Sequence, residues 1–142
     1  SGSLPFVSRP VRIAGQLYLD GGIADSVPVE KALSMGYDRV IVVLTRPEGY
    51  RKKRGKDLPA KMLYSRYPAF VKTNNDRWKK YNAQLGVVEL LEQEGRIFVV
   101  RPSETIKISR LEKDPEVLQA MYDLGVKDAK TRLEDMIQYL NP

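Results

Sequence analysis

One carboxylate in this chain stands where it could do chemistry: Asp20, which is followed by Gly21 and Gly22. The three residues come at the end of the apolar run 16–19, which together with residues 11–14 predicts two short strands around a tight turn at Gly15. Glycine has no Cβ, so the backbone can turn sharply there and hold the carboxylate at the end of the strand. A carboxylate held in this way can act as a general base. The alternative is a plain β-hairpin turn, because Asp-Gly between apolar stretches is the common hairpin signal.

The rest of the sequence offers few other catalytic groups. It contains no histidine and no cysteine, which excludes a Ser-His-Asp triad, a thiol nucleophile and metal sites built on Cys or His. We therefore expect neither a metal nor a cofactor. Eight serines are present, but none lies in Gly-x-Ser-x-Gly, the turn that presents the nucleophile of many hydrolases. The sequence thus supplies a candidate base without a nucleophile.

Two polar residues follow the turn, Asp25 and Ser26. Residues 27–33 directly after them predict the start of a helix, which Gly36 ends. Either side chain can cap that helix, and a proline suits its first turn. The run 38–45 then holds five consecutive apolar residues, mostly β-branched, which indicates a strand buried on both faces. A strand, a helix and a buried strand in this order are typical of an α/β protein.

The remaining elements complete this outline. A strand is expected over residues 96–102, and helices are expected over 60–94 (divided at Pro68), 116–125 and 126–140. We divide the chain near residue 102. Residues 1–102 would form an α/β core, and residues 103–142 a helical extension packed on it, because about 40 residues seldom fold alone.

The chain is basic, with a net charge of +6. Much of the excess lies in one polar loop, in the side chains Arg51, Lys52, Lys53, Arg54 and Lys56. Such a cluster can contact an anionic membrane surface, where Tyr64 or Phe70 could insert, or it can simply be a solvated loop. No aromatic residue interleaves the run, so we do not expect a nucleic-acid site. No apolar run reaches the roughly 20 residues that span a bilayer.

Residues 18–29, Tyr-Leu-Asp-Gly-Gly-Ile-Ala-Asp-Ser-Val-Pro-Val, resemble the aspartate-motif segment of patatin-like phospholipases. In that family a hydrophobic strand leads to Asp-Gly-Gly or Asp-Gly-Ala, and a short loop follows that ends near Pro-Val. The lead-in 3–13, the segment 32–45 and the tail 98–129 are also similar to bacterial members. The resemblance covers nearly the whole chain, but only the C-terminal portion of the family.

The resemblance implies a serine–aspartate dyad, without histidine, that hydrolyses acyl esters of lipids. The general base falls on Asp20, and Gly21 and Gly22 would shape the turn that aims it. The serine elbow and the glycine-rich oxyanion loop precede this segment in the family and are absent from this sequence. We therefore expect the C-terminal part of a three-layer α/β/α hydrolase core, inactive by itself, that meets its lipid or acyl-ester substrate through a parent protein. We place that protein in the cytoplasm, peripheral to the membrane.

Two other functions stay open at this point. The chain could be a non-catalytic module that binds a lipid surface or nucleic acid through the basic loop 51–56. It could also be an assembly element, because a strand of the buried type at an open sheet edge tends to pair with another chain. For that reason we expect a homo-oligomer.

Overall fold

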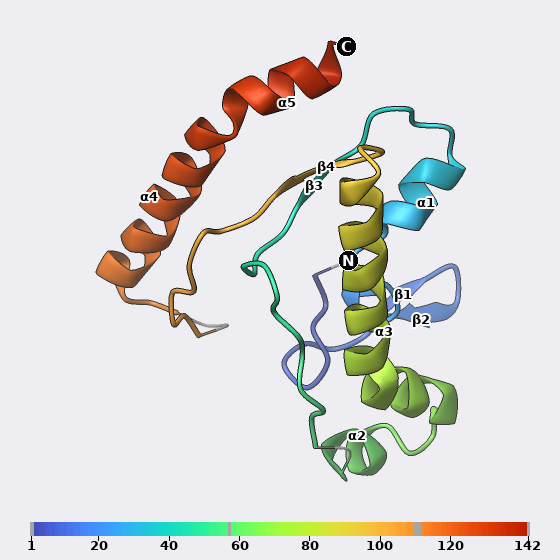
Figure 1. Cartoon of the computed structure of the whole chain (residues 1–142). Helices are drawn as coiled ribbons and strands as arrows, with labels where there is room; N and C mark the ends of the chain where they lie inside the picture. The colour runs from blue at the N-terminus through green and yellow to red at the C-terminus, as the bar shows by residue number, and fades with distance from the viewer. Residues whose placement is uncertain (1, 57, 110–111, 142) are drawn as a thin grey trace. The chain divides into compact units, whose positions relative to one another are not determined.

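The chain is described here from a computed structural model, which describes residues 2–56, 58–109 and 112–141 (Figure 1). It is a mixed α/β protein with two small sheets, so the expected α/β class is confirmed at this level. The helices and strands are β1 (Val11–Ile13), β2 (Gln16–Tyr18), the 3-10 helix η1 (Gly21–Ile23), α1 (Val29–Ser34), β3 (Ile41–Val43), α2 (Leu58–Leu63), α3 (Pro68–Gln93), β4 (Phe98–Val100), α4 (Pro115–Thr131) and α5 (Leu133–Leu140).

The described residues form two compact units. Unit 1 contains the chain up to Pro28 together with Arg51–Val87, and unit 2 contains Val29–Tyr50 together with the chain from Val88 onward. Helix α3 supplies residues to both units. The boundary that composition places near residue 102 stays a prediction.

Unit 1 begins with the hairpin that the sequence predicts. Strands β1 and β2 pair antiparallel, with Val11 opposite Tyr18 and Ile13 opposite Gln16. The two turn residues, Ala14 and Gly15, have φ of 48° and 81°. Positive φ at both central residues gives the turn a twist that matches the twist of the paired strands. The expected pair of short strands around a tight turn is confirmed.

The N-terminal segment of unit 1 is attached to α2 and α3 through aromatic side chains. The ring of Tyr64 is buried, with its centroid 5.5 Å from that of Phe6 and 4.6 Å from that of Phe70. The Phe6 amide also donates to the Tyr64 hydroxyl at 3.2 Å. Pro68 begins α3, as the sequence predicts, because proline is tolerated in the first turn of a helix but not in its interior.

Unit 2 is built on a parallel pair of strands. Strand β3 lies beside β4, with Ile41 opposite Phe98 and Val43 opposite Val100. Val42 is buried, but Ile41 and Val43 are 37% and 71% exposed, so the prediction that β3 is buried on both faces is wrong. Successive side chains of a strand point to opposite faces, and within the described residues only the face of Val42 is covered.

Helix α4 has a well-defined start. The carboxylate of Asp114 accepts the amide of Glu116 at 2.9 Å, which caps the helix. Just before it, the amides of Asp114, Lys113 and Ser109 donate to the exposed carboxylate of Glu112 and lower its pKa, since these bonds favour the charged form. The segment that enters α4 is therefore ordered by two carboxylates.

The break between α4 and α5 lies later than expected. The sequence predicts a break at Gly125, whereas α4 continues through it to Thr131 and ends at Arg132, which has φ −99° and ψ 2°. A glycine inside a helix costs about 1 kcal/mol relative to alanine, which weakens a helix without ending it. The guanidinium of Arg132 lies over the Phe98 ring, 4.8 Å from its centroid, so a packing contact accompanies the bend.

Tyr139 attaches α5 to the segments that lead into both strands. Its hydroxyl donates to the carbonyl of Arg96 at 3.0 Å and accepts the amide of Val40 at 3.1 Å. Its ring lies 5.8 Å from that of Phe98. The apolar side chains Leu133, Ile137 and Leu140 of α5 are exposed.

We expect Tyr139→Phe to lower the free energy of unfolding by about 1–3 kcal/mol, because it leaves the half-buried Val40 amide without its acceptor. Urea denaturation followed by circular dichroism measures this change. Tyr122, which is 67% exposed on α4, is the matched control, and Tyr122→Phe should leave the unfolding curve unchanged. Equal curves for the two variants would show that the Tyr139 hydroxyl does not stabilise unit 2.

Candidate functional site

Asp20 is fixed at the point where the β2 strand gives way to η1. Its Oδ1 accepts the amide of Gly22 at 2.8 Å, which makes it the N-cap of this 3-10 helix. Its own amide donates to the carbonyl of Ser3 at 2.9 Å. The side chain is half-buried. Backbone and carboxylate are thus both held, so the carboxylate has one preferred orientation.

Gly22 is the glycine whose missing Cβ leaves room for the carboxylate of Asp20. A Cβ at this position would lie 3.2 Å from Oδ1 of Asp20 and 3.8 Å from Nη2 of Arg77. A Cβ at Gly21 would meet nothing within 4 Å. The sequence predicts that both glycines shape the turn. In the structure, only Gly22 lies where a Cβ would contact the carboxylate. Gly22 lets the backbone amide approach the carboxylate, and Arg77 brings a positive charge to the same place.

Asp25 and Ser26 tie the following loop to its surroundings. The hydroxyl of Ser26 donates to the carbonyl of Gly22 at 2.6 Å. The amide group of Gln84, a buried residue of α3, donates to Oδ1 of Asp25. These bonds go to the turn and to α3, and not to the amides at the start of α1 as the expected cap requires. The two residues therefore brace the Asp20 loop.

Sequence reasoning missed the two α3 side chains that reach this loop, Arg77 and Gln84. They are seven residues apart, which is close to two helical turns, so they lie on one face of α3. Lys52 and Asn82 were also missed as a pair. The available signal was the helical spacing of Arg77 and Gln84 next to the apolar Leu85, which is buried. Polar residues on the buried face of a helix seldom lack a partner, so this spacing indicates that both side chains contact another segment.

The serine hydroxyls beside Asp20 are already engaged. Ser3 donates to the carbonyl of Arg9 at 2.6 Å, and Ser26 donates to Gly22 as described above. Within the described residues, Oδ2 of Asp20 accepts no hydrogen bond. The carboxylate therefore has one oxygen held by the backbone and one that can accept a proton from a further hydroxyl.

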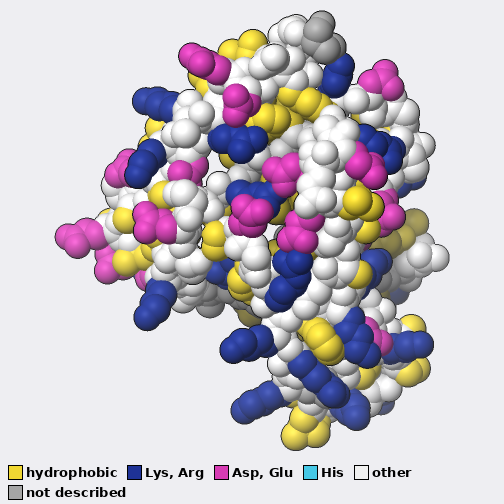
Figure 2. Space-filling model, in the orientation of Figure 1, with side chains coloured by type: hydrophobic (Ala, Val, Ile, Leu, Met, Phe, Trp, Pro, Cys, Tyr) yellow, Lys and Arg dark blue, Asp and Glu magenta, His cyan; other side chains and the backbone are white. Residues whose placement is uncertain are grey.

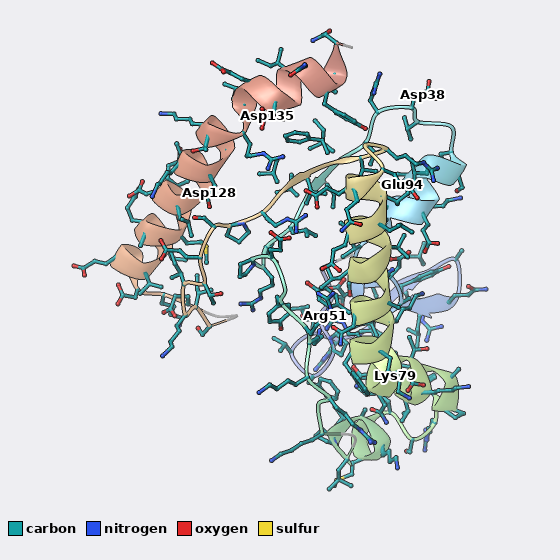
Figure 3. The ribbon with its side chains drawn as sticks, viewed as in Figure 1. Asp38, Arg51, Lys79, Glu94, Asp128 and Asp135 are labelled. Atoms are coloured by element: carbon teal, nitrogen blue, oxygen red, sulfur yellow. The ribbon has the colours of Figure 1, made fainter. Side chains whose placement is uncertain are left out.

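The basic loop is attached to α3 at Lys52. The Lys52 amide donates to Oδ1 of Asn82 at 2.8 Å, and Nδ2 of Asn82 donates to the Lys52 carbonyl at 3.0 Å. The Lys52 ammonium also lies 5.3 Å from the centroid of the Tyr81 ring. The side chains on either side of Lys52 are exposed; they are Arg51, Lys53, Arg54 and Lys56, and Figure 3 labels Arg51. The loop is thus held in place at Lys52, and the charged side chains on either side of it are exposed.

Unit 2 contains a separate apolar cavity of about 660 Å³. It lies between the ends of β3 and β4, the segment after β4, and α4, and its lining includes Val43, Val100, Ile106, Met121 and Leu124. Asp128 of α4 (Figure 3) lies at its edge and accepts the amide of Ser103 at 2.8 Å. The exposed side chains of β3 therefore open onto an apolar surface.

Neither a cluster of metal-ligating side chains nor a membrane-spanning helix occurs in the part of the chain that the structure describes. There, no three acidic residues come together as ligands for a metal ion. Among the same residues, no helix combines the length and the apolar character that crossing a membrane requires.

Comparison with protein-family models gives a match over the C-terminal half of the chain. A family model described as "Domain of unknown function (DUF6363)" matches residues 67–141, which is more than half of the chain. That description names no activity. No curated protein matches the chain.

We expect Gly22→Ala to destabilise the chain by about 1 kcal/mol more than Gly21→Ala, since only the first pushes a methyl group against a charge-assisted hydrogen bond. Both substitutions restrict the unfolded chain equally, so their difference isolates the contact. Chemical denaturation of the two variants measures it. Gly22→Ala as stable as Gly21→Ala would mean that the carboxylate is not held where the structure places it.

Proposed function

The chain belongs to the DUF6363 family, and we propose that it contributes the general base of a lipid acyl hydrolase of the patatin-like kind. The observation that carries the proposal is the carboxylate of Asp20, held by the Gly22 amide at 2.8 Å with its second oxygen available. This geometry suits a base that acts repeatedly from one position, because positioning of the reacting groups lowers the barrier.

The proposed chemistry is acyl transfer to a serine. Oδ2 of Asp20 accepts the proton of a serine hydroxyl as that oxygen attacks the carbonyl of an ester, and the proton then passes to the departing alcohol. Water releases the acyl group in the second half of the reaction.

The serine of this dyad is proposed to lie outside residues 1–142. The hydroxyls of Ser3 and Ser26 donate to backbone carbonyls, and Gly-x-Ser-x-Gly is absent from the sequence. In this proposal, β3 and β4 belong to a three-layer α/β/α core that the rest of the protein completes. The isolated chain would then show no ester hydrolysis.

We expect Asp20→Asn to reduce kcat/KM for a short-chain nitrophenyl ester by about 10²–10⁴-fold in the protein that also contains the serine, as loss of a general base does. Asparagine keeps an oxygen that accepts the Gly22 amide, so the thermal transition should stay near that of the unaltered protein. Asp20→Ala should lose activity and also lower the free energy of unfolding by about 0.5–2 kcal/mol, because alanine cannot accept the Gly22 amide and so removes the N-cap of η1.

Asp38→Asn, in an exposed turn of unit 2, is the control and should leave turnover unchanged. Normal activity of Asp20→Asn contradicts the proposal. Turnover by residues 1–142 alone that disappears in Asp20→Asn would place the nucleophile inside this chain and overturn its proposed position.

A second proposal rests on the exposed face of β3. Ile41 and Val43 are apolar, exposed and next to the cavity of unit 2, and apolar surface of this kind favours association. We propose that the isolated chain covers this face with a second copy.

Light scattering should therefore give a mass above the 16.2 kDa of one chain, and Val43→Glu should return it to one chain. Val7→Glu, an exposed apolar position in unit 1, is the control and should keep the larger mass. A strictly monomeric mass for the unaltered chain contradicts this second proposal.

A further inference from the structure

Positive charge is concentrated in one stretch of unit 1. Residues 51–75 contain eight Lys or Arg and one acidic residue, Asp57, so this stretch has a net charge of +7 whereas the whole chain has +6. The stretch includes the basic loop, α2 and the start of α3. Figure 2 shows the Lys and Arg side chains gathered around hydrophobic side chains over α2.

The hydrophobic side chains at the centre of this stretch are strongly exposed. Leu58, Met62 and Leu63 of α2 are 65%, 71% and 66% exposed, and Tyr67 just after the helix is 50% exposed. Contiguous exposed apolar side chains with a polar rim mark surfaces that meet another apolar phase. We call these residues, together with Lys53, Lys56, Lys61 and Lys72, the α2 surface.

The orientation of α2 is set by its other face. Ala60 and Tyr64, one helical turn apart, are 1% and 9% exposed, and Tyr64 contacts Phe6 and Phe70 as described above. The expectation that Tyr64 or Phe70 inserts into a membrane is therefore wrong for Tyr64, whose ring is in the core. Because α2 is anchored through this face, Leu58, Met62 and Leu63 are held outward and not merely mobile.

Cations and apolar groups lie on the same side of unit 1. Lys61 of α2 and Lys72 of α3 line one open hollow together with Ser65 and Asn75. Pro68 and Val71 complete its lining, so the hollow combines lysine and polar residues with apolar ones, as the boundary between headgroups and acyl chains does. The lysines thus border the apolar residues of α2 from the side of α3 as well as from the basic loop.

We infer that the α2 surface docks unit 1 onto an anionic lipid bilayer, with Leu58, Met62 and Leu63 in the interfacial region and the lysines against the headgroups. An anionic bilayer matches both the lysines and the apolar side chains of the α2 surface, since its negatively charged headgroups lie above an apolar acyl-chain region. Nucleic acid matches only the cations, because aliphatic side chains find no partner among phosphates and the exposed aromatic residues are few. This inference does not rest on the proposed hydrolase, since binding is measured without turnover.

The test is co-sedimentation of the chain with vesicles of equal parts phosphatidylcholine and phosphatidylglycerol, compared with vesicles of phosphatidylcholine alone. We expect binding to the anionic vesicles at about 0.1 M salt and its loss at about 1 M, where the screening length falls from about 10 to 3 Å. The triple variant Lys53→Gln, Lys56→Gln, Lys61→Gln should bind roughly 100-fold more weakly, at about five-fold for each charge.

The apolar residues are tested separately. The triple variant Leu58→Gln, Met62→Gln, Leu63→Gln keeps every charge and uses a good helix former at exposed positions, so the fold should be retained. We expect it to bind the anionic vesicles at least ten-fold more weakly. Circular dichroism confirms that each variant is folded before binding is compared.

Two matched controls remove the same number of groups elsewhere. One is Lys107→Gln, Lys113→Gln, Lys130→Gln, which takes three exposed lysines from unit 2. The other is Leu133→Gln, Ile137→Gln, Leu140→Gln, which takes the exposed apolar residues of α5. Both should bind anionic vesicles as the unaltered chain does.

Several results would overturn the inference. They are no binding to anionic vesicles, equal binding to neutral vesicles, an apolar α2 variant that binds undiminished, and a control that loses binding as much as the α2 variants. Binding to a single-stranded oligonucleotide at concentrations where the vesicles are not bound would identify the surface as a nucleic-acid site, and would overturn it too.

Discussion

The amide of Gly22 holds the carboxylate of Asp20 at 2.8 Å, and the arrangement of the surrounding loop in unit 1 depends on this bond. The missing Cβ at position 22 leaves this bond undisturbed, because an added methyl group would meet Oδ1 at 3.2 Å and push the carboxylate aside. The Ser26 hydroxyl and the Asp25–Gln84 bond then fix the loop that follows. Oδ1 of the carboxylate accepts the Gly22 amide, and this bond also fixes the direction in which Oδ2 points. This combination separates Asp20 from an ordinary hairpin aspartate.

The two parts of unit 1 for which functions are proposed share a common support in α3. Its residues reach the Asp20 loop through Arg77 and Gln84, and its residue Asn82 clamps the basic loop at Lys52. The proposed base and the proposed docking surface are thus both attached to one helix. For an enzyme that acts on lipid esters, such a scaffold would attach the protein to the phase that contains its substrate.

Local backbone chemistry explains what the sequence could predict. The turn at Gly15 and the helix end at Gly36 were predictable, since glycine adopts the positive φ found at both positions without a steric cost, and the start of α3 at Pro68 follows from its ring. The Asp-Gly-Gly turn was found from its residue types, although Gly21 and Gly22 form a 3-10 helix and neither has a positive φ.

Contacts between distant residues explain what the sequence could not predict. The end of α4 accompanies the stacking of Arg132 on Phe98, 34 positions away along the chain, and not the glycine at 125. The burial of β3 depends on which elements cover it, which its own apolar residues do not encode. The outward position of Leu63 follows from the burial of its neighbour Tyr64, whose partners come from two other segments.

The most direct test of the central claim is covalent labelling by a fluorophosphonate of the protein that contains both this chain and the proposed serine. A fluorophosphonate reacts with a serine only when a base activates its hydroxyl, so the reaction reads the role of Asp20 without a lipid substrate. The proposal predicts one labelled serine, and a labelling rate that falls by about 10²-fold or more in Asp20→Asn and is unchanged in Asp38→Asn. A serine labelled equally fast in Asp20→Asn, or no labelled serine at all, would contradict it.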